Sequence, residues 1–292
     1  MTENRGVAAL LTSTLCFALM AVFVKVAAAT VPPSEVAVFR FLIVFVPILL
    51  IPKIRAKSFQ YTRLLPLVLR GLFGGLAVLL YFVSVAHIPV GVASLLNSTS
   101  PVFSGILAAI FLGERLTVRN VGPLVITIIG VVLVVTGHST PDETLGFGKW
   151  ELAGLASAVC AAAAVTAMRG ARRTESTWSI LFFLSIFGLI VTLPAALPVW
   201  KAPSPREWLF ILLAGTAALL AQILMTWAYR WVETLAAGII SQLGVVIATI
   251  LGVVYLGDVL TLLTVVGIAI SITGVATMII FGRARPAAVL AE

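Results

Sequence analysis

The chain has 292 residues, of which 61% are apolar and only 10% are charged. A soluble domain carries roughly 25% charged residues, so this composition excludes an ordinary soluble protein and indicates one that lies in lipid. The formal net charge of +8 would suggest nucleic acid as a partner in a soluble chain, but here the basic residues follow a pattern typical of membrane topology.

Ten apolar segments, each long enough to cross a hydrocarbon layer of ~30 Å as a helix, follow one another with short polar breaks. The first follows Arg5 as in a signal peptide, but no small-residue cleavage site precedes Lys25, so we expect it to remain a helix. We therefore predict an all-α polytopic membrane protein. Its ten transmembrane helices are expected at 6–28, 34–52, 64–86, 91–112, 119–136, 150–169, 178–199, 208–230, 236–256 and 261–281.

The basic residues gather on alternate loops, and this bias predicts which side of the membrane each loop faces. With the N-terminus in the cytoplasm, the inner loops and ends hold Arg5, Lys53, Arg55, Lys57, Arg63, Arg115, Arg119, Arg169, Arg172, Arg173, Arg230, Arg283 and Arg285, and the outer loops hold Lys149, Lys201 and Arg206. We expect both termini in the cytoplasm, a bacterial inner (plasma) membrane location, and no nucleic-acid partner.

The sequence repeats itself at a constant offset of 144 residues. Residues 93–117 align with 237–261 without a gap, and Ser13 and Lys25 fall on Ser157 and Arg169. We predict a first repeat at 1–138, an outer linker at 139–149 and a second repeat with a short cytoplasmic tail at 150–292. Because each repeat has five helices, the second enters the membrane from the opposite side, which makes the repeats inverted around a central cavity. The alternative is that duplication only enlarged the helical bundle.

Polar residues at helical spacing mark two segments that correspond in the repeat. Ser94, Asn97, Ser98 and Pro101 share one face of segment 91–112, where Pro101 should kink the helix. The matching face of segment 236–256 carries Ser241 and Gln242. Such groups can simply bond helices together, but paired polar faces at one depth favour a binding cavity.

Other polar and aromatic residues complete a predicted substrate-binding set. Segments 6–28, 64–86 and 208–230 contribute one or two residues each. Cys16 and Cys160 lie inside predicted helices and suggest neither a disulfide nor a metal site. The set is Ser13, Phe17, Tyr81, Ser94, Asn97, Ser98, Gln222, Ser241 and Gln242.

Three basic residues fall inside predicted spans. Lys25 lies near the outer end of the first span and has either a structural or a gating role. Arg40 lies roughly 9 Å inside the second span, where it either holds an outer gate closed or meets an anionic substrate group. Arg70 can snorkel toward the inner interface. Glu35 and Asp258 are candidate partners for these cations.

Several chemical signals are missing. No acidic residue lies near mid-membrane, so facilitated diffusion or exchange is at least as plausible as proton coupling. The sequence has no phosphate-binding loop and no His/acid/nucleophile set, which argues against an enzyme and predicts no cofactor and no metal. Gly71, Gly74 and Gly75 are candidates for either flexing or close helix packing.

Residues 100–103 (Ser-Pro-Val-Phe), 107–117 and Gly130-Val131 make the chain resemble the EamA-type proteins of the drug/metabolite transporter superfamily. A fainter copy surrounds Gly257-Asp258 and Gly274-Val275. The resemblance implies ten helices in two inverted repeats, with a cavity lined mainly by the first, third, fourth, sixth, eighth and ninth helices.

We therefore expect a secondary transporter of small neutral or zwitterionic metabolites that works by alternating access. The resemblance points to export of amino acids, including aromatic ones, as in YddG-type exporters, because the cavity is expected to be uncharged and partly aromatic. Alternatives are import of riboflavin or S-adenosylmethionine, export of a drug or quaternary amine, or a non-transporting membrane sensor or scaffold. The expected partners are a small-molecule substrate and membrane lipid, and the expected state is a monomer or homodimer.

Overall fold

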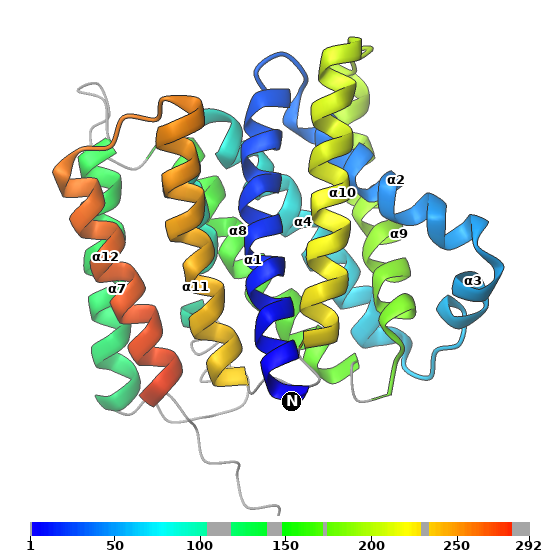
Figure 1. The fold of residues 1–292 in the computed structure, drawn as a ribbon, viewed down its shortest axis with the longest axis horizontal. Coiled ribbons are helices and arrows are strands. Elements are labelled where there is room, and N and C mark those ends of the chain that lie inside the picture. The colour runs from blue at the N-terminus through cyan, green and yellow to red at the C-terminus, as the bar shows by residue number, and fades with distance from the viewer. Residues whose placement is uncertain (1, 104–117, 139–147, 172–173, 229–233, 282–292) are drawn as a thin grey trace, which may run out of the picture.

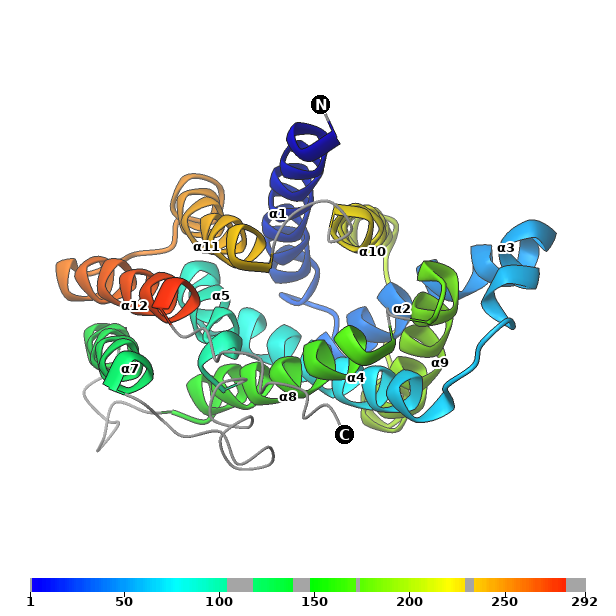
Figure 2. The same cartoon turned by 90° about the horizontal axis from the view of Figure 1, so that it is seen from below.

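The computed structural model describes residues 2–103, 118–138, 148–171, 174–228 and 234–281, and all regular structure in these ranges is helical. The helices are α1 (Thr2–Ala27), α2 (Pro33–Leu50), α3 (Pro52–Ser58), α4 (Leu64–His87), α5 (Val90–Ser98), α7 (Val118–His138), α8 (Lys149–Ala171), α9 (Thr177–Ala196), η1 (Leu197–Val199), α10 (Pro205–Ala228), α11 (Thr234–Leu251), η2 (Gly252–Leu256) and α12 (Leu262–Phe281). Figure 1 shows the helices standing side by side, and Figure 2 shows that they lie in two rows, one with α12, α11, α1 and α10 and the other with α7, α8, α4 and α9.

Length and hydropathy identify the helices that suit a membrane. In the described ranges, six helices are long and apolar enough to cross it, and 122–137, 240–256 and 262–277 form shorter apolar helical stretches. Large apolar side chains such as Ile128 on α7, Leu212 on α10 and Val265 on α12 are about half exposed, which suits contact with lipid tails rather than water. The chain is thus a multi-pass membrane protein.

Two local features depart from the predicted spans. The loop after the second span contains a short helix, α3, which begins at Pro52, where proline costs nothing because the first N–H of a helix has no partner. The fourth span is not continuous. Helix α5 ends at Ser98, Thr99 forms a turn, and helix resumes at Ser100 before the undescribed residues 104–117.

The 144-residue offset recurs in the structure. Helices α9, α11 and α12 begin at Thr177, Thr234 and Leu262, each 144 residues after the first residue of α2, α5 and α7. The packing partners correspond as well, since α1 packs on α10 in the way that α8 packs on α4. Helices α7 and α12, which correspond to one another, pair at one end of the molecule (Figure 2).

Corresponding helices run in opposite directions. Lys25, near the end of α1, donates to the carbonyl of Ile88, which directly follows α4, so α1 and α4 end on the same side. Trp150, at the start of α8, stacks on His87, the last residue of α4, with ring centroids 3.5 Å apart. Helix α8 therefore starts where α1 ends. We call the side where α1 begins the N-side.

Positions that correspond in the two repeats also touch one another. Gln242 Nε2 donates to the carbonyl of Ser98 over 3.4 Å, and Ser271 Oγ donates to the carbonyl of Thr127 over 3.3 Å. Each pair is separated by 144 residues. Two equivalent positions can contact only next to the axis that relates them, so the pseudo-twofold axis passes through both contacts.

Glycines set the distance between α4 and α9. A Cβ atom on Gly75 would lie 2.8 Å from the Cα of Gly188, and one on Gly71 would lie 2.5 Å from the carbonyl oxygen of Phe183. Both obstacles are backbone atoms, which cannot rotate away. The contacts support close packing rather than flexing as the role of Gly71 and Gly75.

A carboxylate joins the repeats on the N-side. Glu175, between α8 and α9, is 8% exposed and accepts the backbone N–H groups of Thr62 and Arg63 at the start of α4. Burial opposes its ionisation, but hydrogen bonds from Thr62, Arg63 and Thr174 outweigh burial and lower the pKa of Glu175. The ionised carboxylate thus stabilises the N-terminus of a helix in the other repeat.

We predict that Gly75→Val destabilises the protein by about 1–3 kcal/mol, because the added side chain must push two backbones apart. Gly122→Ala serves as the control, since a Cβ atom there has no neighbour within 4 Å. The measurement is the unfolding temperature of the purified protein in detergent. Equal unfolding temperatures for the two variants would contradict this role of Gly75.

The Glu175 contact predicts acid-sensitive stability. Because folding lowers the pKa of this carboxyl, its contribution is complete above the pKa of the unfolded chain and is lost as the pH falls through the folded value. We expect Glu175→Gln to be less stable than wild type near pH 7 and to lose less stability between about pH 7 and pH 4. Parallel unfolding-temperature profiles over that pH range would argue against it.

Candidate substrate-binding cavity

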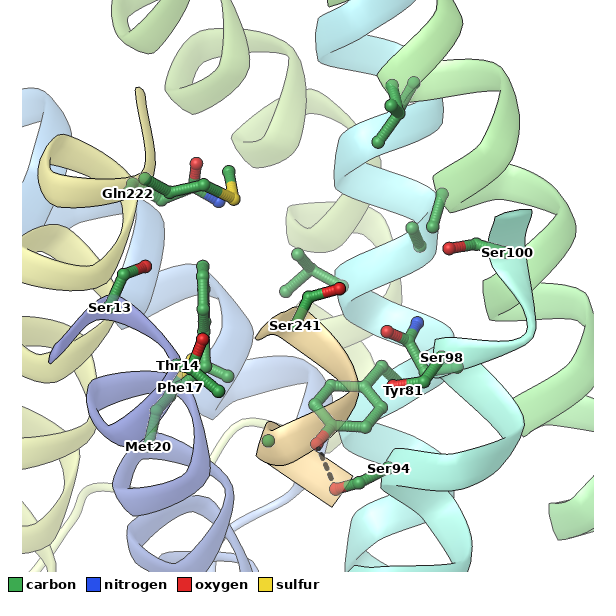
Figure 3. Close-up of a pocket in the computed structure, with 18 of the residues that line it drawn as sticks. Ser13, Thr14, Phe17, Met20, Tyr81, Ser94, Ser98, Ser100, Gln222 and Ser241 are labelled. Atoms are coloured by element: carbon green, nitrogen blue, oxygen red, sulfur yellow. Dashed lines mark hydrogen bonds between the residues drawn. The ribbon is translucent and has the colours of Figure 1, made fainter. Parts of the chain in front are cut away.

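A cavity of about 280 Å³ lies among α1, α2, α4, α5, α8, α10 and α11. Apart from α2, these are the helices that the family resemblance implies as its lining. All nine residues of the predicted substrate-binding set border it, as do Arg40 and Pro101. Figure 3 shows Ser13, Phe17 and Gln222 across the cavity from Tyr81, Ser94 and Ser98. The structure brings these residues together, and their part in binding stays a prediction.

The polar side of the cavity is built around the interrupted helix after Pro89. Tyr81 on α4 and Ser94 on α5 share a hydrogen bond of 2.9 Å between their hydroxyls (Figure 3). Asn97 Nδ2 donates to Ser157 Oγ on α8 over 2.9 Å. These bonds hold the end of α5 against α4 and α8, and they leave the carbonyl oxygen of the Asn97 amide as an acceptor.

Gln242 reaches the same place from the second repeat. Its Nε2 donates to the carbonyl of Ser98, next to the break in the helix where Pro101 supplies no N–H. Its side chain is 4% exposed, and its Oε1 is buried without a hydrogen-bond partner in the described part of the chain. A buried amide oxygen without a donor is costly, so this atom is suited to accept a hydrogen bond from a bound solute.

The facing side of the cavity is formed by α1 and α10. Ser13 Oγ donates to the carbonyl of Ala221 over 2.8 Å, which joins the two helices. The next residue, Gln222, is 8% exposed and extends toward the cavity (Figure 3). Phe17 and Met20 add apolar surface along α1. This side therefore combines one amide with an apolar face.

Two arginines also line the cavity, so the expectation of an uncharged cavity is wrong. Arg40 on α2 is 4% exposed and Arg70 on α4 is 7% exposed. Arg70 does not snorkel to the interface as the sequence suggested. Its Nη1 would lie only 2.8 Å from a Cβ on Gly74, one turn along α4, so glycine leaves room for the guanidinium to lie along the helix toward the cavity.

Lys25 lies outside the cavity, near the side opposite the N-side. Its Nζ donates to the carbonyl of Ile88 over 2.6 Å. Asp258, from the second repeat, accepts the N–H of Val90 over 2.9 Å and is the negative charge that acts on Lys25. We call these four residues the Lys25–Asp258 clasp. It joins α1, the corner between α4 and α5, and the segment before α12.

The carboxylate of Glu35 does not serve as the partner of a cation inside the spans. It is completely buried near the start of α2, where one oxygen accepts the backbone N–H of Lys201 over 3.0 Å. Of the two candidate partners, Asp258 is therefore the one that acts electrostatically on Lys25. Glu35 instead binds the backbone N–H of Lys201, which precedes α10.

The cavity is closed toward the clasp. On α1 its lining extends from Leu10 to Met20, and Lys25 follows about 8 Å further along the helix. Completely buried apolar residues, including Ala21, Val24 and Val85, occupy the space between. The lining thus belongs to the N-side and middle of the molecule, and an apolar layer separates it from the opposite side.

Other predicted features lie elsewhere. Segment 107–117, which carries much of the family resemblance, lies outside the described residues, as do the side chains of Arg119 and Arg169. Among the residues that the structure describes, no group of His, Cys, Asp or Glu side chains could hold a metal ion. Cys16 and Cys160 are free thiols.

Comparison with known families gives a match over both repeats. The model of the EamA-like transporter family matches residues 4–136 and again 148–280. The two matches are offset by 144 residues, as the sequence repeat and the helix starts are.

Several relatives are transporters by name. The chain is 29% identical over 263 residues to the pseudopaline exporter CntI of Pseudomonas aeruginosa, covering 90% of this chain and 91% of the relative. It is 30% identical over 222 residues to an S-adenosylmethionine uptake transporter of Rickettsia bellii, covering 74% of this chain and 73% of that protein. A solved crystal structure aligns with a TM-score of 0.63 at 20% identity, over 92% of this chain and 96% of that one, which shows a shared fold.

Proposed function

The chain belongs to the EamA-like transporter family, and on that premise we propose that it is a secondary transporter that exports a small amino-acid-like metabolite by alternating access. We place it in a bacterial inner membrane with both termini in the cytoplasm, as a monomer or homodimer without catalytic activity. Its ten spans would form two inverted five-helix repeats.

One observation carries the proposal. The contact between Ser98 and Gln242 joins equivalent positions of the two repeats, and both residues line the cavity. The cavity therefore lies on the pseudo-twofold axis. Inverted repeats around a site on their axis can exchange conformations, so that the site faces one side of the membrane and then the other.

The chemistry of the lining supports an amino-acid-like cargo. Arg40 offers donors for a carboxylate, and Gln242 Oε1 offers an acceptor for an amine. Phe17 and Tyr81 provide aromatic surface for the rest of the solute. A solute with a carboxylate, an amine and a side chain would use the donors of Arg40, the acceptor on Gln242 and the aromatic surface.

The relatives support transport but differ in direction. One is named as an exporter of pseudopaline and another as an uptake transporter of S-adenosylmethionine. We favour export, because the relative with a match over 90% of this chain is an exporter. A sensor or scaffold that moves nothing is the alternative from another class, and counterflow in vesicles separates the two.

We predict that Asn97→Ala and Gln242→Ala each lower transport at least ~10-fold in protein that still folds, since each removes a hydrogen-bonding group from the cavity. Counterflow of amino acids into proteoliposomes measures the effect. Gln60→Ala, which removes an exposed amide outside the cavity, is the control. Undiminished transport in both cavity variants would show that Asn97 and Gln242 are not part of the binding site.

The Lys25–Asp258 clasp predicts which side of the cavity is closed. In a variant with Cys16 and Cys160 replaced by alanine, a cysteine introduced by Met20→Cys should react with a membrane-impermeant thiol reagent from one side only. Adding Lys25→Met should increase labelling from the other side, because it removes the bond to Ile88 that holds the clasp together. Lys201→Met, which removes an exposed positive charge elsewhere, should leave the labelling pattern unchanged. An identical pattern in both variants would mean that the clasp does not close this side.

A further inference from the structure

Helix α3 lies at the edge of the molecule, where it packs on α2 and α9 (Figures 1 and 2). It carries three exposed basic side chains, and a fourth precedes α4: Lys53, Arg55, Lys57 and Arg63. Apolar side chains in the same stretch of chain are 43–74% exposed, namely Leu50, Ile51, Phe59, Tyr61, Leu64 and Leu65. A surface that mixes basic, aromatic and aliphatic side chains at the edge of a membrane protein is suited to contact with lipid headgroups.

A surface groove of about 580 Å³ lies beside the end of α3. The first repeat contributes Lys57, Gln60, Tyr61 and Thr62 to its lining, and the second contributes Thr174 and Ser176. The hydroxyl of Ser179, on α9, is shared between the carbonyls of Lys57 and Gln60 at 3.0 and 3.1 Å. The groove is therefore formed where the two repeats meet, and hydrogen bonds between them fix its shape.

Two side chains present unused polar groups to the groove. The hydroxyls of Ser176 and Ser179 bond the carbonyl of Lys57, whereas its exposed ammonium group bonds none of the residues that the structure describes. The ring of Tyr61 packs edge-on against Phe183, with ring centroids 5.2 Å apart. This contact holds the phenol at the groove, where its hydroxyl can donate a hydrogen bond. A positive charge beside a hydroxyl donor suits a phosphate group.

The acid beside the groove is already occupied. Glu175 follows the lining residue Thr174 and could otherwise compete for Lys57. Its carboxylate is buried, and its two oxygens accept hydrogen bonds from Thr62, Arg63 and Thr174. These bonds direct the carboxylate toward the start of α4, so Lys57 is left for an anion from outside the protein.

The apolar side chains near the groove favour a lipid over a soluble anion. Phe59 packs on Phe182 of α9, with ring centroids 4.9 Å apart, and still remains half exposed. Leu64 and Leu65, at the start of α4, are exposed as well. Acyl chains can cover such side chains, whereas a free phosphate cannot. A phospholipid would thus use the polar and the apolar parts of this surface together.

We propose that the groove beside Lys57 binds the headgroup of an anionic phospholipid, whose phosphate accepts hydrogen bonds from Lys57 Nζ and the Tyr61 hydroxyl. A zwitterionic phospholipid is a poorer ligand, because Lys57 repels the positive group that it carries. Since both repeats line the groove, the bound lipid joins them on the N-side, next to the Glu175 contact. The inference depends on the membrane location of the chain and not on what it transports.

Short-chain phospholipids test the groove on the full-length protein, purified in detergent and freed of lipid. The probes are dihexanoyl phosphatidylglycerol, dihexanoyl phosphatidylcholine, and glycerol phosphate, which has the charge without the acyl chains. Binding is measured as the rise in unfolding temperature over a concentration series. We expect phosphatidylglycerol to bind at least ~5-fold more tightly than phosphatidylcholine, which is about the factor that one basic side chain contributes at an anionic lipid surface.

Variants of α3 connect this preference to the groove. Lys57→Gln should bring the ratio of the two lipid affinities close to one. Arg55→Gln removes a positive charge from the same helix, but Arg55 does not line the groove, so this variant should keep the ratio of the wild type. Lys57→Arg retains a cation and should also keep the preference. Both side chains are exposed, and without lipid all three variants should unfold at the temperature of the wild type.

The outcomes distinguish a lipid groove from its alternatives. A preference lost in Lys57→Gln and kept in Arg55→Gln would support the groove. Equal affinities for the two phospholipids would overturn it, and so would an equal loss in both glutamine variants, which indicates diffuse attraction to a basic surface. Glycerol phosphate that binds as tightly as phosphatidylglycerol would show a site for soluble anions and would also overturn the proposal.

Discussion

The contact between Ser98 and Gln242 is the constraint from which the rest of the arrangement follows. It places equivalent positions of the two repeats against each other at Ser98, the last residue of α5, where the helix is interrupted just before Pro101. The Thr127–Ser271 contact, also between equivalent positions, extends the same axis to α7 and α12. Once these points lie on an axis, every helix of the first repeat has a counterpart on the other side of it. The cavity lies where the axis passes between α5 and α11.

The two sides of the molecule are held by different polar contacts. On the N-side, Glu175 from the second repeat caps the start of α4 in the first. On the opposite side, Asp258 from the second repeat caps the start of α5 in the first. Both are charge-assisted bonds to backbone N–H groups that a helix cannot satisfy itself. Such bonds thus join the two repeats on both sides of the molecule.

Much of this arrangement could be predicted from the sequence, because lipid restricts where polar groups can lie. Ser94, Asn97 and Ser98 share a helical face, and a polar face inside a membrane must meet either protein or a water-filled space. The constant offset of 144 residues places Ser241 and Gln242 on the corresponding face of the second repeat, so the same argument applies to them. All of them border one cavity. Whether they bind the cargo is a separate matter, which geometry does not test.

The direction of the Arg70 side chain and the partner of Glu35 could not be predicted in this way. Arg70 looked able to snorkel, since its position near the start of α4 says nothing of the direction in which its side chain lies. That direction depends on Gly74, which leaves room beside the helix, and on Leu184 of α9, which packs against the same glycine. The negative charge of Glu35 suggested a cation as its partner. In the structure its carboxylate instead accepts the backbone N–H of Lys201, in the loop before α10. Both outcomes depend on contacts between distant segments.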